Sequence, residues 1–226
     1  MDELWRALPP TLSLVIGGMV LWLAVGVAAG LVSGLRPGSL ADRVVTVLSP
    51  VAVIVPVFLL ALLLLGVFLY THFLWIQPGY APLSQGVGRW LGRMVMPWIA
   101  LAAAQAGLTA RLTRASVIEV SAEDYIRTAR AKGLSRQRVA WAHVLRPSAV
   151  SVLASLSVGV STLLGSAAII DQTFALDGIG QAPLTAVKNN DLMVIMGTIL
   201  VTVILIAVAS LVLDICQALI DPRIAR

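Results

Sequence analysis

The chain has 226 residues, of which 59% are apolar and 12% are charged, and its mean hydropathy is +0.95. Soluble domains contain about 45–50% apolar and about 25% charged residues, so this composition excludes an ordinary soluble protein. The formal net charge of +5 would suggest nucleic-acid binding in a soluble chain. Here the basic residues gather in a few loops, which is typical of proteins that cross a membrane several times.

Long apolar runs predict an all-α, polytopic membrane protein with about five transmembrane helices. We expect the whole chain, residues 1–226, to form a single transmembrane domain. The predicted spans cover approximately residues 12–35, 44–70, 94–110, 148–170 and 192–220. The single cysteine, Cys216, lies in the last span, so an internal disulfide is excluded.

Small residues and prolines distinguish the first two spans. Gly26, Gly30 and Gly34 recur every four residues in the first span, a spacing that lets two helices approach closely. The partner helix could belong to this chain or to a second membrane subunit. Pro50 and Pro56 should kink the second span because proline removes a backbone donor. Broken helices often line transport paths, although a kink that serves packing alone is an equal alternative.

The fourth span carries a row of small and polar residues on one helical face. Such a face could line a hydrophilic passage, or it could pack helix against helix. The residues are Ser151, Ser155, Gly159, Thr162 and Ser166. Asp214, in the last span, is expected to pair with a basic loop residue rather than to relay protons.

The distribution of Lys and Arg predicts the orientation of the chain. The loops near residues 36–43, the segment 111–147 and the C-terminal residues carry most of the basic side chains, which places them in the cytoplasm. Five spans then put the N-terminus outside, with no signal in this chain to place it there. We therefore expect a further helix upstream of the sequence given.

Residues 111–147, called the polar segment below, contain eight of the sixteen Lys and Arg residues. Ser121, Glu123 and Asp124 precede an apolar and basic run, which predicts a helix over residues 122–132. Its acidic residues come first and its basic residues later, as the helix dipole prefers. Gly133 supplies a C-terminal stop, and a second short helix begins at Ser135.

The residues DYIRTARAKGLSRQRV, followed by VLRPSAV, closely resemble the cytoplasmic coupling signature of bacterial ABC importer permeases. Most of that superfamily has Glu-Ala-Ala, three further residues and Gly. The form here, with Arg127, Thr128, Ala129 and Gly133, is similar to the oligopeptide, dipeptide and nickel branch. The strings RLTRASVIEV, ALPPTL, PGY and DPRI also resemble that branch, and favour the first of its two permease subunits.

The resemblance implies a type I ABC importer permease fold with a cytoplasmic coupling helix that docks into an ATPase subunit. It assigns docking to Glu123, Asp124, Tyr125, Arg127, Thr128, Ala129, Arg130, Ala131, Lys132 and Gly133. It also implies a second permease subunit, an extracytoplasmic solute-binding protein and a place in the bacterial cytoplasmic (inner) membrane. Short peptides are the first expected substrate and nickel the second. His143 departs from the aliphatic residue of many members, so the detailed docking contacts stay open.

Catalysis is not expected in this chain. It has no G-x-x-x-x-G-K-[ST] loop for nucleotide phosphates, so ATP and magnesium would be bound by partner subunits. It also has no Ser/His/Asp constellation and no residues at metal-ligand spacing. A membrane-embedded hydrolase is therefore a distant alternative. A nearer one is a non-transporting membrane protein whose basic loop binds anionic lipid. Such binding needs charge alone and would survive shuffling of residues 122–133.

Overall fold

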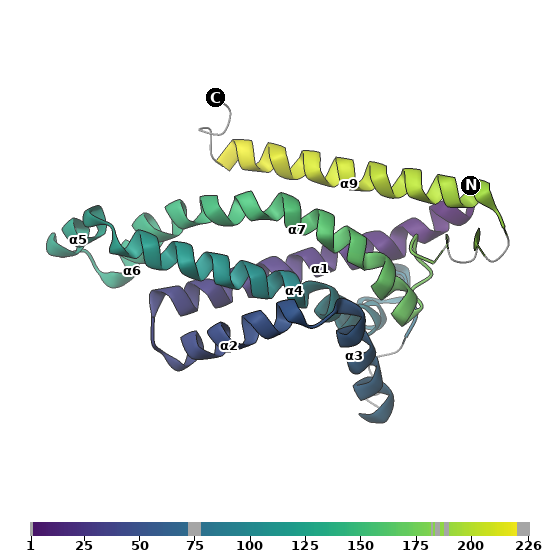
Figure 1. The fold of residues 1–226 in the computed structure, drawn as a ribbon, viewed down its shortest axis with the longest axis horizontal. Helices are drawn as coiled ribbons and strands as arrows, with labels where there is room; N and C mark the ends of the chain where they lie inside the picture. Colours follow the sequence, from purple (N-terminus) through teal and green to yellow (C-terminus); the bar gives the residue numbers. More distant parts are fainter. Residues whose placement is uncertain (1, 72–77, 182, 184–185, 188–189, 221–226) are drawn as a thin grey trace. The chain divides into compact units, whose positions relative to one another are not determined.

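The computed structural model describes residues 2–71, 78–181, 183, 186–187 and 190–220, and within them it is helical and has no strand. Figure 1 shows the helices, and the expected all-α fold is confirmed. In chain order they are α1 (Asp2–Leu35), α2 (Leu40–Ile54), α3 (Val57–Thr71), the 3-10 helix η1 (Leu83–Gln85), α4 (Val87–Ala122), α5 (Asp124–Ala131), α6 (Arg136–Val139), the π-helical segment η2 (Ala140–Val144), α7 (Leu145–Phe174) and α9 (Leu192–Ile220).

Two of the described helices, α1 and α4, are long and apolar enough to cross a membrane, or three if α2 and α3 together form one span. Helices α7 and α9, of 30 and 29 residues, coincide with the other predicted spans. Both include residues whose side chains lie outside the described set, Asp214 among them. The count of five spans thus stays a prediction.

Helix α4 is much longer than predicted. The span was expected to end at Arg111, but the helix continues without a break to Ala122 and has 36 residues. The reason is that apolar positions persist on one side of this extension: Val117 is fully buried and Val120 packs against the same cluster. At 1.5 Å per residue α4 is about 54 Å long. A hydrocarbon core of about 30 Å leaves several of its turns in water.

The second predicted span is interrupted at one proline. Helix α2 runs through Pro50 to Ile54, and α3 begins at Val57, so the helical hydrogen bonding stops around Pro56. Pro56 has no N–H to donate to the preceding turn. The expected broken helix is therefore confirmed at Pro56, whereas Pro50 is accommodated inside α2.

The chain divides into two compact units, and the single domain expected from sequence stays a prediction. The first comprises residues 1–21, 55–103 and 160–212. In its interior Trp98 packs on Gly17, and its indole N–H donates to the Ser13 carbonyl at 2.9 Å. Trp98 also meets Trp90 edge to face, with ring centroids 5.0 Å apart. These contacts fasten α4 to α1 within this unit.

The second unit comprises residues 22–54, 104–159 and 213–226, and it contains the polar segment. Here the glycine row of α1 faces α4. A Cβ atom added at Gly30 would lie 2.5 Å from the Cβ of Thr113, and one added at Gly34 would lie 2.7 Å from that of Val117. Since no real Cβ contact is so short, these positions need glycine. The glycine row therefore packs within this chain, the first of the two interpretations offered by the sequence.

Candidate functional site

Helix α5 is the short helix predicted in the polar segment. Figure 1 shows it with α6 between the end of α4 and the start of α7. Its first residue is Asp124, two residues later than predicted, because α4 extends through Ala122. The Glu123 carbonyl accepts the N–H groups of Ile126 and Arg127 at 3.1 and 3.4 Å, so Glu123 begins the new helix. A carboxylate in the first turn suits the positive end of the helix dipole.

Gly133 ends the helix, as predicted. Its φ is +79°, in the left-handed region that glycine adopts most easily. The Leu134 N–H donates back to the Ala129 carbonyl at 3.4 Å, the hydrogen bond of a Schellman motif. The Leu134 side chain then packs against the cluster beneath α5, the apolar contact that accompanies this motif. Gly133 thus turns the chain sharply toward α6.

The inner face of α5 rests on a small apolar cluster. Ile126 is fully buried and Ala129 is 8% exposed. The other buried members are Val117 of α4, Val139 of α6 and Val144 of η2, and partly buried apolar side chains of neighbouring helices surround them. Burying an isoleucine side chain contributes about 1.5–3 kcal/mol. The cluster therefore fixes an eight-residue helix that could not hold its shape alone.

The outer face of α5 is polar and exposed. Tyr125 is 45% exposed, and Asp124, Arg127, Thr128 and Lys132 are also exposed. Arg127 approaches Asp124 at 3.4 Å, but both side chains are so open to water that this ion pair adds little stability. The surface thus presents one aromatic ring, two hydroxyls and charges of both signs.

The predicted docking residues divide between the two faces. Glu123, Ala131 and Gly133 are exposed with the outer-face side chains, whereas Ala129 is buried in the cluster under the helix. Ala129, which the resemblance assigns to docking, therefore supports the helix from inside this chain. The Arg130 side chain lies outside the described set.

A π-helical turn follows α6 and was not predicted. In η2 each hydrogen bond spans one residue more than in an α-helix, and such bulges are frequent at functional sites. The Trp141 indole in this segment is 73% exposed. The Tyr125 hydroxyl donates to the His143 carbonyl at 3.3 Å, which ties the outer face of α5 to η2. The only sequence feature that could have indicated η2 is weak: a single Trp lies among basic and small residues.

A buried carboxylate next to the polar segment was also missed. Asp42 is 5% exposed and accepts Arg114 Nε at 2.6 Å, Arg114 Nη2 at 3.2 Å and the Gly38 N–H at 2.8 Å. The Ser33 hydroxyl donates to the same carboxylate. Ser39 caps α2, since its hydroxyl accepts the Asp42 N–H at 3.2 Å. This network joins the end of α1, the turn after it and the start of α2 to α4.

The five small and polar residues predicted to line a passage in the fourth span differ in their exposure and contacts. Gly159 is buried, and a Cβ there would lie 2.3 Å from the Trp22 ring, so this position serves helix packing. Thr162 is exposed and Ser166 is half-buried, with the Ser166 hydroxyl donating to the Thr162 carbonyl at 3.0 Å. The side chains of Ser151 and Ser155 lie outside the described set. A passage-lining role therefore stays a prediction for part of the row only.

Across the described residues there is no cluster of three His, Cys, Asp or Glu side chains that could hold a metal ion. What α5 presents is an exposed polar face above a buried apolar face.

Comparison with known proteins identifies the kind of chain that carries this surface. Residues 26–226 match the family described as binding-protein-dependent transport system inner membrane component. A probable peptide ABC transporter permease protein of Sinorhizobium fredii is 33% identical over 220 residues, covering 97% of this chain and 70% of that protein. The dipeptide transport system permease protein of Bacillus subtilis is 31% identical over 228 residues, covering 99% and 70%.

Two further comparisons also match transport proteins. The glutathione transport system permease protein of Escherichia coli is 33% identical over 223 residues, covering 99% of this chain and 70% of that protein. An inward-facing structure of the MetNI methionine ABC transporter shares the fold, with a TM-score of 0.74 and 17% identity over 98% of this chain and 97% of that one. The chain therefore belongs to the family of inner membrane components of binding-protein-dependent transport systems.

Proposed function

We propose that this chain is a permease subunit of an ATP-driven importer that carries short peptides across the bacterial cytoplasmic membrane. The relatives reported above are named for peptide, dipeptide and glutathione transport, and glutathione is itself a short peptide. These names favour peptides over nickel, the other substrate expected from the sequence. The few charged side chains in the spans favour a weakly selective passage, with selectivity resting on an extracytoplasmic binding protein.

The observation that carries the proposal is the division of α5 into two faces. Its apolar face is filled from within the chain by Val117, Val139 and Val144. Its polar face, with Tyr125 and Arg127, points to solvent. An interface needs a surface that is held rigid before the partner arrives, because ordering it afterwards would weaken binding. We assign this face to a groove of a cytoplasmic ATPase subunit, which would bind ATP and magnesium.

Force would pass from the ATPase to the membrane through the same contacts. ATP binding would close two ATPase subunits and move α5 of this chain together with the equivalent helix of a second permease subunit. Because Ile126 is buried against Val117, a displacement of α5 is applied directly to the end of α4. The passage would then switch between outward-facing and inward-facing states, an equilibrium that both nucleotide and substrate bias.

Uptake of a labelled dipeptide into cells that express the complete transporter tests this function. We expect ATP-dependent uptake that excess unlabelled dipeptide abolishes and that excess nickel leaves intact. Glu123→Arg and Gly133→Pro should abolish uptake while the chain still inserts in the membrane. Normal uptake by both variants would contradict the docking role, and competition by nickel alone would identify the other substrate.

Shuffling residues 122–133 separates the transporter from a protein that merely binds lipid through its basic loop. Composition and charge are unchanged by the shuffle, so lipid binding by charge would survive it. Docking needs Ile126 on the buried face of α5 and Tyr125 on the exposed face. Because the shuffle moves both residues, docking would be lost. Retained uptake by the shuffled chain would contradict the assignment of α5.

A further inference from the structure

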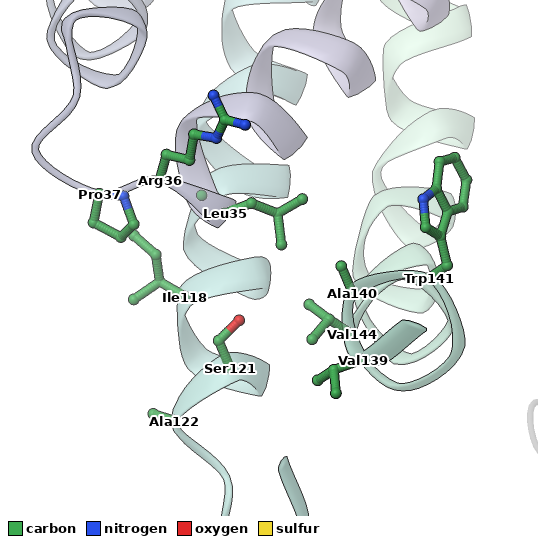
Figure 2. Close-up of a pocket in the computed structure, with 11 residues that line it drawn as sticks. Leu35, Arg36, Pro37, Ile118, Ser121, Ala122, Val139, Ala140, Trp141 and Val144 are labelled. Atoms are coloured by element: carbon green, nitrogen blue, oxygen red, sulfur yellow. The ribbon is translucent and has the colours of Figure 1, made fainter. Parts of the chain in front are cut away.

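Two cavities in the described part of the chain differ in what lines them. The larger, of about 700 Å³, lies in the second compact unit, where Figure 2 shows Val139 and Val144 on one side and Ile118 on the other. Most of its lining is apolar. The smaller, of about 210 Å³, lies in the first compact unit among α1, α7, α9 and the loop after α7, and the buried carboxyl group of Asp171 borders it. The smaller cavity therefore selects its ligand by charge as well as by shape.

Asp171 lies in the last turn of α7 and holds the loop that follows it. The residue is 2% exposed, and its Oδ1 and Oδ2 accept the N–H groups of Gly178 and Gln181 at 2.9 and 3.2 Å. A Cβ atom added at Gly178 would lie 2.8 Å from Asp171 Oδ2, so the close approach of the loop needs glycine. Backbone donors on both oxygens favour the ionised form of the carboxyl group. The carboxylate thus has a fixed position beside the cavity.

The described residues supply no cation to the buried carboxylate. No Lys, Arg or His side chain among them forms an ion pair with Asp171, and its charged neighbour, Asp177, has the same sign. A buried carboxylate without a cationic partner is costly, and hydrogen bonds to neutral groups offset only part of that cost. A cationic ligand in the adjoining cavity would offset the remainder.

The hydroxyl groups around the cavity present acceptors as well. Thr198 and Thr202 of α9 donate their hydroxyl hydrogens to the carbonyls of Val194 and Thr198, at 2.6 and 2.8 Å. Thr11 of α1 donates to the Ala7 carbonyl at 3.0 Å. A hydroxyl has one hydrogen and two lone pairs, so while these bonds persist the three oxygens can only accept from a ligand. A carboxylate and three such oxygens match a group that only donates, such as a primary ammonium group.

The size and opening of the cavity limit the ligand to one end of a longer molecule. Ile199 and Val203, which line it, are 57% and 58% exposed, so the cavity is open on the side of α9. Its volume is below the range of about 300–1,000 Å³ that is usual for small-molecule sites. Leu164, Ala167 and Ala168 of α7 contribute apolar surface to this space. A ligand with an ammonium group and a short apolar end therefore fits, with its remainder outside.

We propose that this cavity binds the α-ammonium group of a short peptide, an inference that rests on the proposed transport function. The ammonium group donates to the Asp171 carboxylate, and the hydroxyl oxygens of Thr198 and Thr202 supply further acceptors. Every unmodified peptide has this group, whatever its side chains. The site thus accepts peptides as a class and leaves discrimination among them to the binding protein.

Saturation-transfer difference NMR on the complete transporter in nanodiscs, without a binding protein, tests the proposal. The probes are dialanine and N-acetyl-dialanine, which differ in the positive charge of the amino end. We expect dialanine to bind at least about tenfold more tightly, the effect of one hydrogen bond to a charged group. Equal binding of the two peptides, or no binding of dialanine, would overturn the site. Displacement of dialanine by an equal concentration of potassium ions would overturn it in favour of an inorganic cation.

Two pairs of variants locate the effect. Asp171→Asn should remove the preference for the free amino end, whereas Asp177→Asn, at an exposed carboxylate of the same loop, should keep it. Because Asp171 also holds the loop, Thr202→Val supplies a second test: it removes an acceptor from the cavity, leaves the loop contacts in place and should weaken dialanine binding about threefold. Its control, Thr173→Val, removes a hydroxyl that donates to the Ile169 carbonyl at 2.8 Å and does not line the cavity. An unchanged preference in Asp171→Asn, or equal dialanine binding by Thr202→Val and Thr173→Val, would overturn the site.

Uptake of a labelled dipeptide separates failure of this inference from failure of the transport function. Uptake by the intact transporter together with equal binding of dialanine and N-acetyl-dialanine would overturn the ammonium site and leave the transport function standing. Absence of dipeptide uptake would overturn the transport function and the inference that rests on it.

Discussion

Arg114 and Asp42, 72 residues apart in the sequence, form a two-pronged ion pair, with Nε 2.6 Å from Oδ1 and Nη2 3.2 Å from Oδ2. Arg114 lies one helical turn before Val117, the residue on which α5 rests. The pair thus locks the start of α2 to the part of α4 that carries the polar segment. It gives that part of the chain a fixed base.

We predict that the two partners act as a unit. Arg114→Ala and Asp42→Asn should each lower the midpoint of thermal unfolding of the purified chain, since each leaves a largely buried polar partner unsatisfied. Arg114→Lys should restore only part of the loss, because an ammonium group cannot make the paired contact. Arg111→Ala, at an exposed position of the same helix, serves as the control and should change little. Losses that simply add in the double variant would argue against direct coupling.

Gly133 offers a test of backbone conformation alone. A Cβ added there would meet no atom within 4 Å, so the effect of Gly133→Ala comes from its positive φ. The expected destabilisation of the turn is about 1–2 kcal/mol, and Gly133→Asn should be milder because asparagine tolerates this region. The rate of tryptic cleavage within the polar segment measures how often the turn at Gly133 unfolds locally. Gly165→Ala, in a helix with open space around it, should not accelerate cleavage; equal rates in Gly133→Ala and the intact chain would contradict the role given to the turn.

Ile126 and Tyr125 are neighbours in sequence with opposite roles. Ile126→Ala should destabilise the polar segment by about 2–5 kcal/mol, the usual range for removing a buried isoleucine side chain. Tyr125→Ala removes an exposed ring and one hydrogen bond to the His143 carbonyl, so its effect on stability should be small. Hydrogen exchange of the α5 amides measures both. Similar acceleration by the two substitutions would mean that the two faces of α5 are not distinct.

Gly30 tests the close approach of α1 and α4. A leucine there would drive its Cβ into Thr113 and the Ala110 carbonyl, at 2.5 and 2.6 Å, so the helices would have to separate. We expect Gly30→Leu to lower the yield of folded chain in mild detergent, judged by size-exclusion chromatography. Gly66→Leu places the same side chain where no atom lies within 4 Å, and its yield should match that of the intact chain. A normal profile for Gly30→Leu would contradict tight packing.

The features predictable from sequence were those with local causes. Gly133 ends α5 because a left-handed residue is needed where a helix turns back, and Pro56 interrupts a helix because it lacks a donor. The end of α4 was predicted too early. Arg111 was interpreted as the end of the apolar span, although apolar positions continue on one side of the helix beyond it. Asp42 and Arg114 could not be paired in advance, since their contact depends on how α2 packs on α4. For the same reason, the direction of Ala129 became clear only when the surface beneath α5 was known.

Co-purification of the ATPase subunits with the tagged chain tests the central claim most directly. The full transporter is expressed with the intact chain, with Tyr125→Ala combined with Arg127→Glu on the outer face of α5, or with Arg43→Glu as an exposed control. Docking through α5 predicts that the intact chain and the control retain the ATPase subunits, while the outer-face variant remains folded and loses them. Retention of the ATPase subunits by the folded outer-face variant would contradict the account.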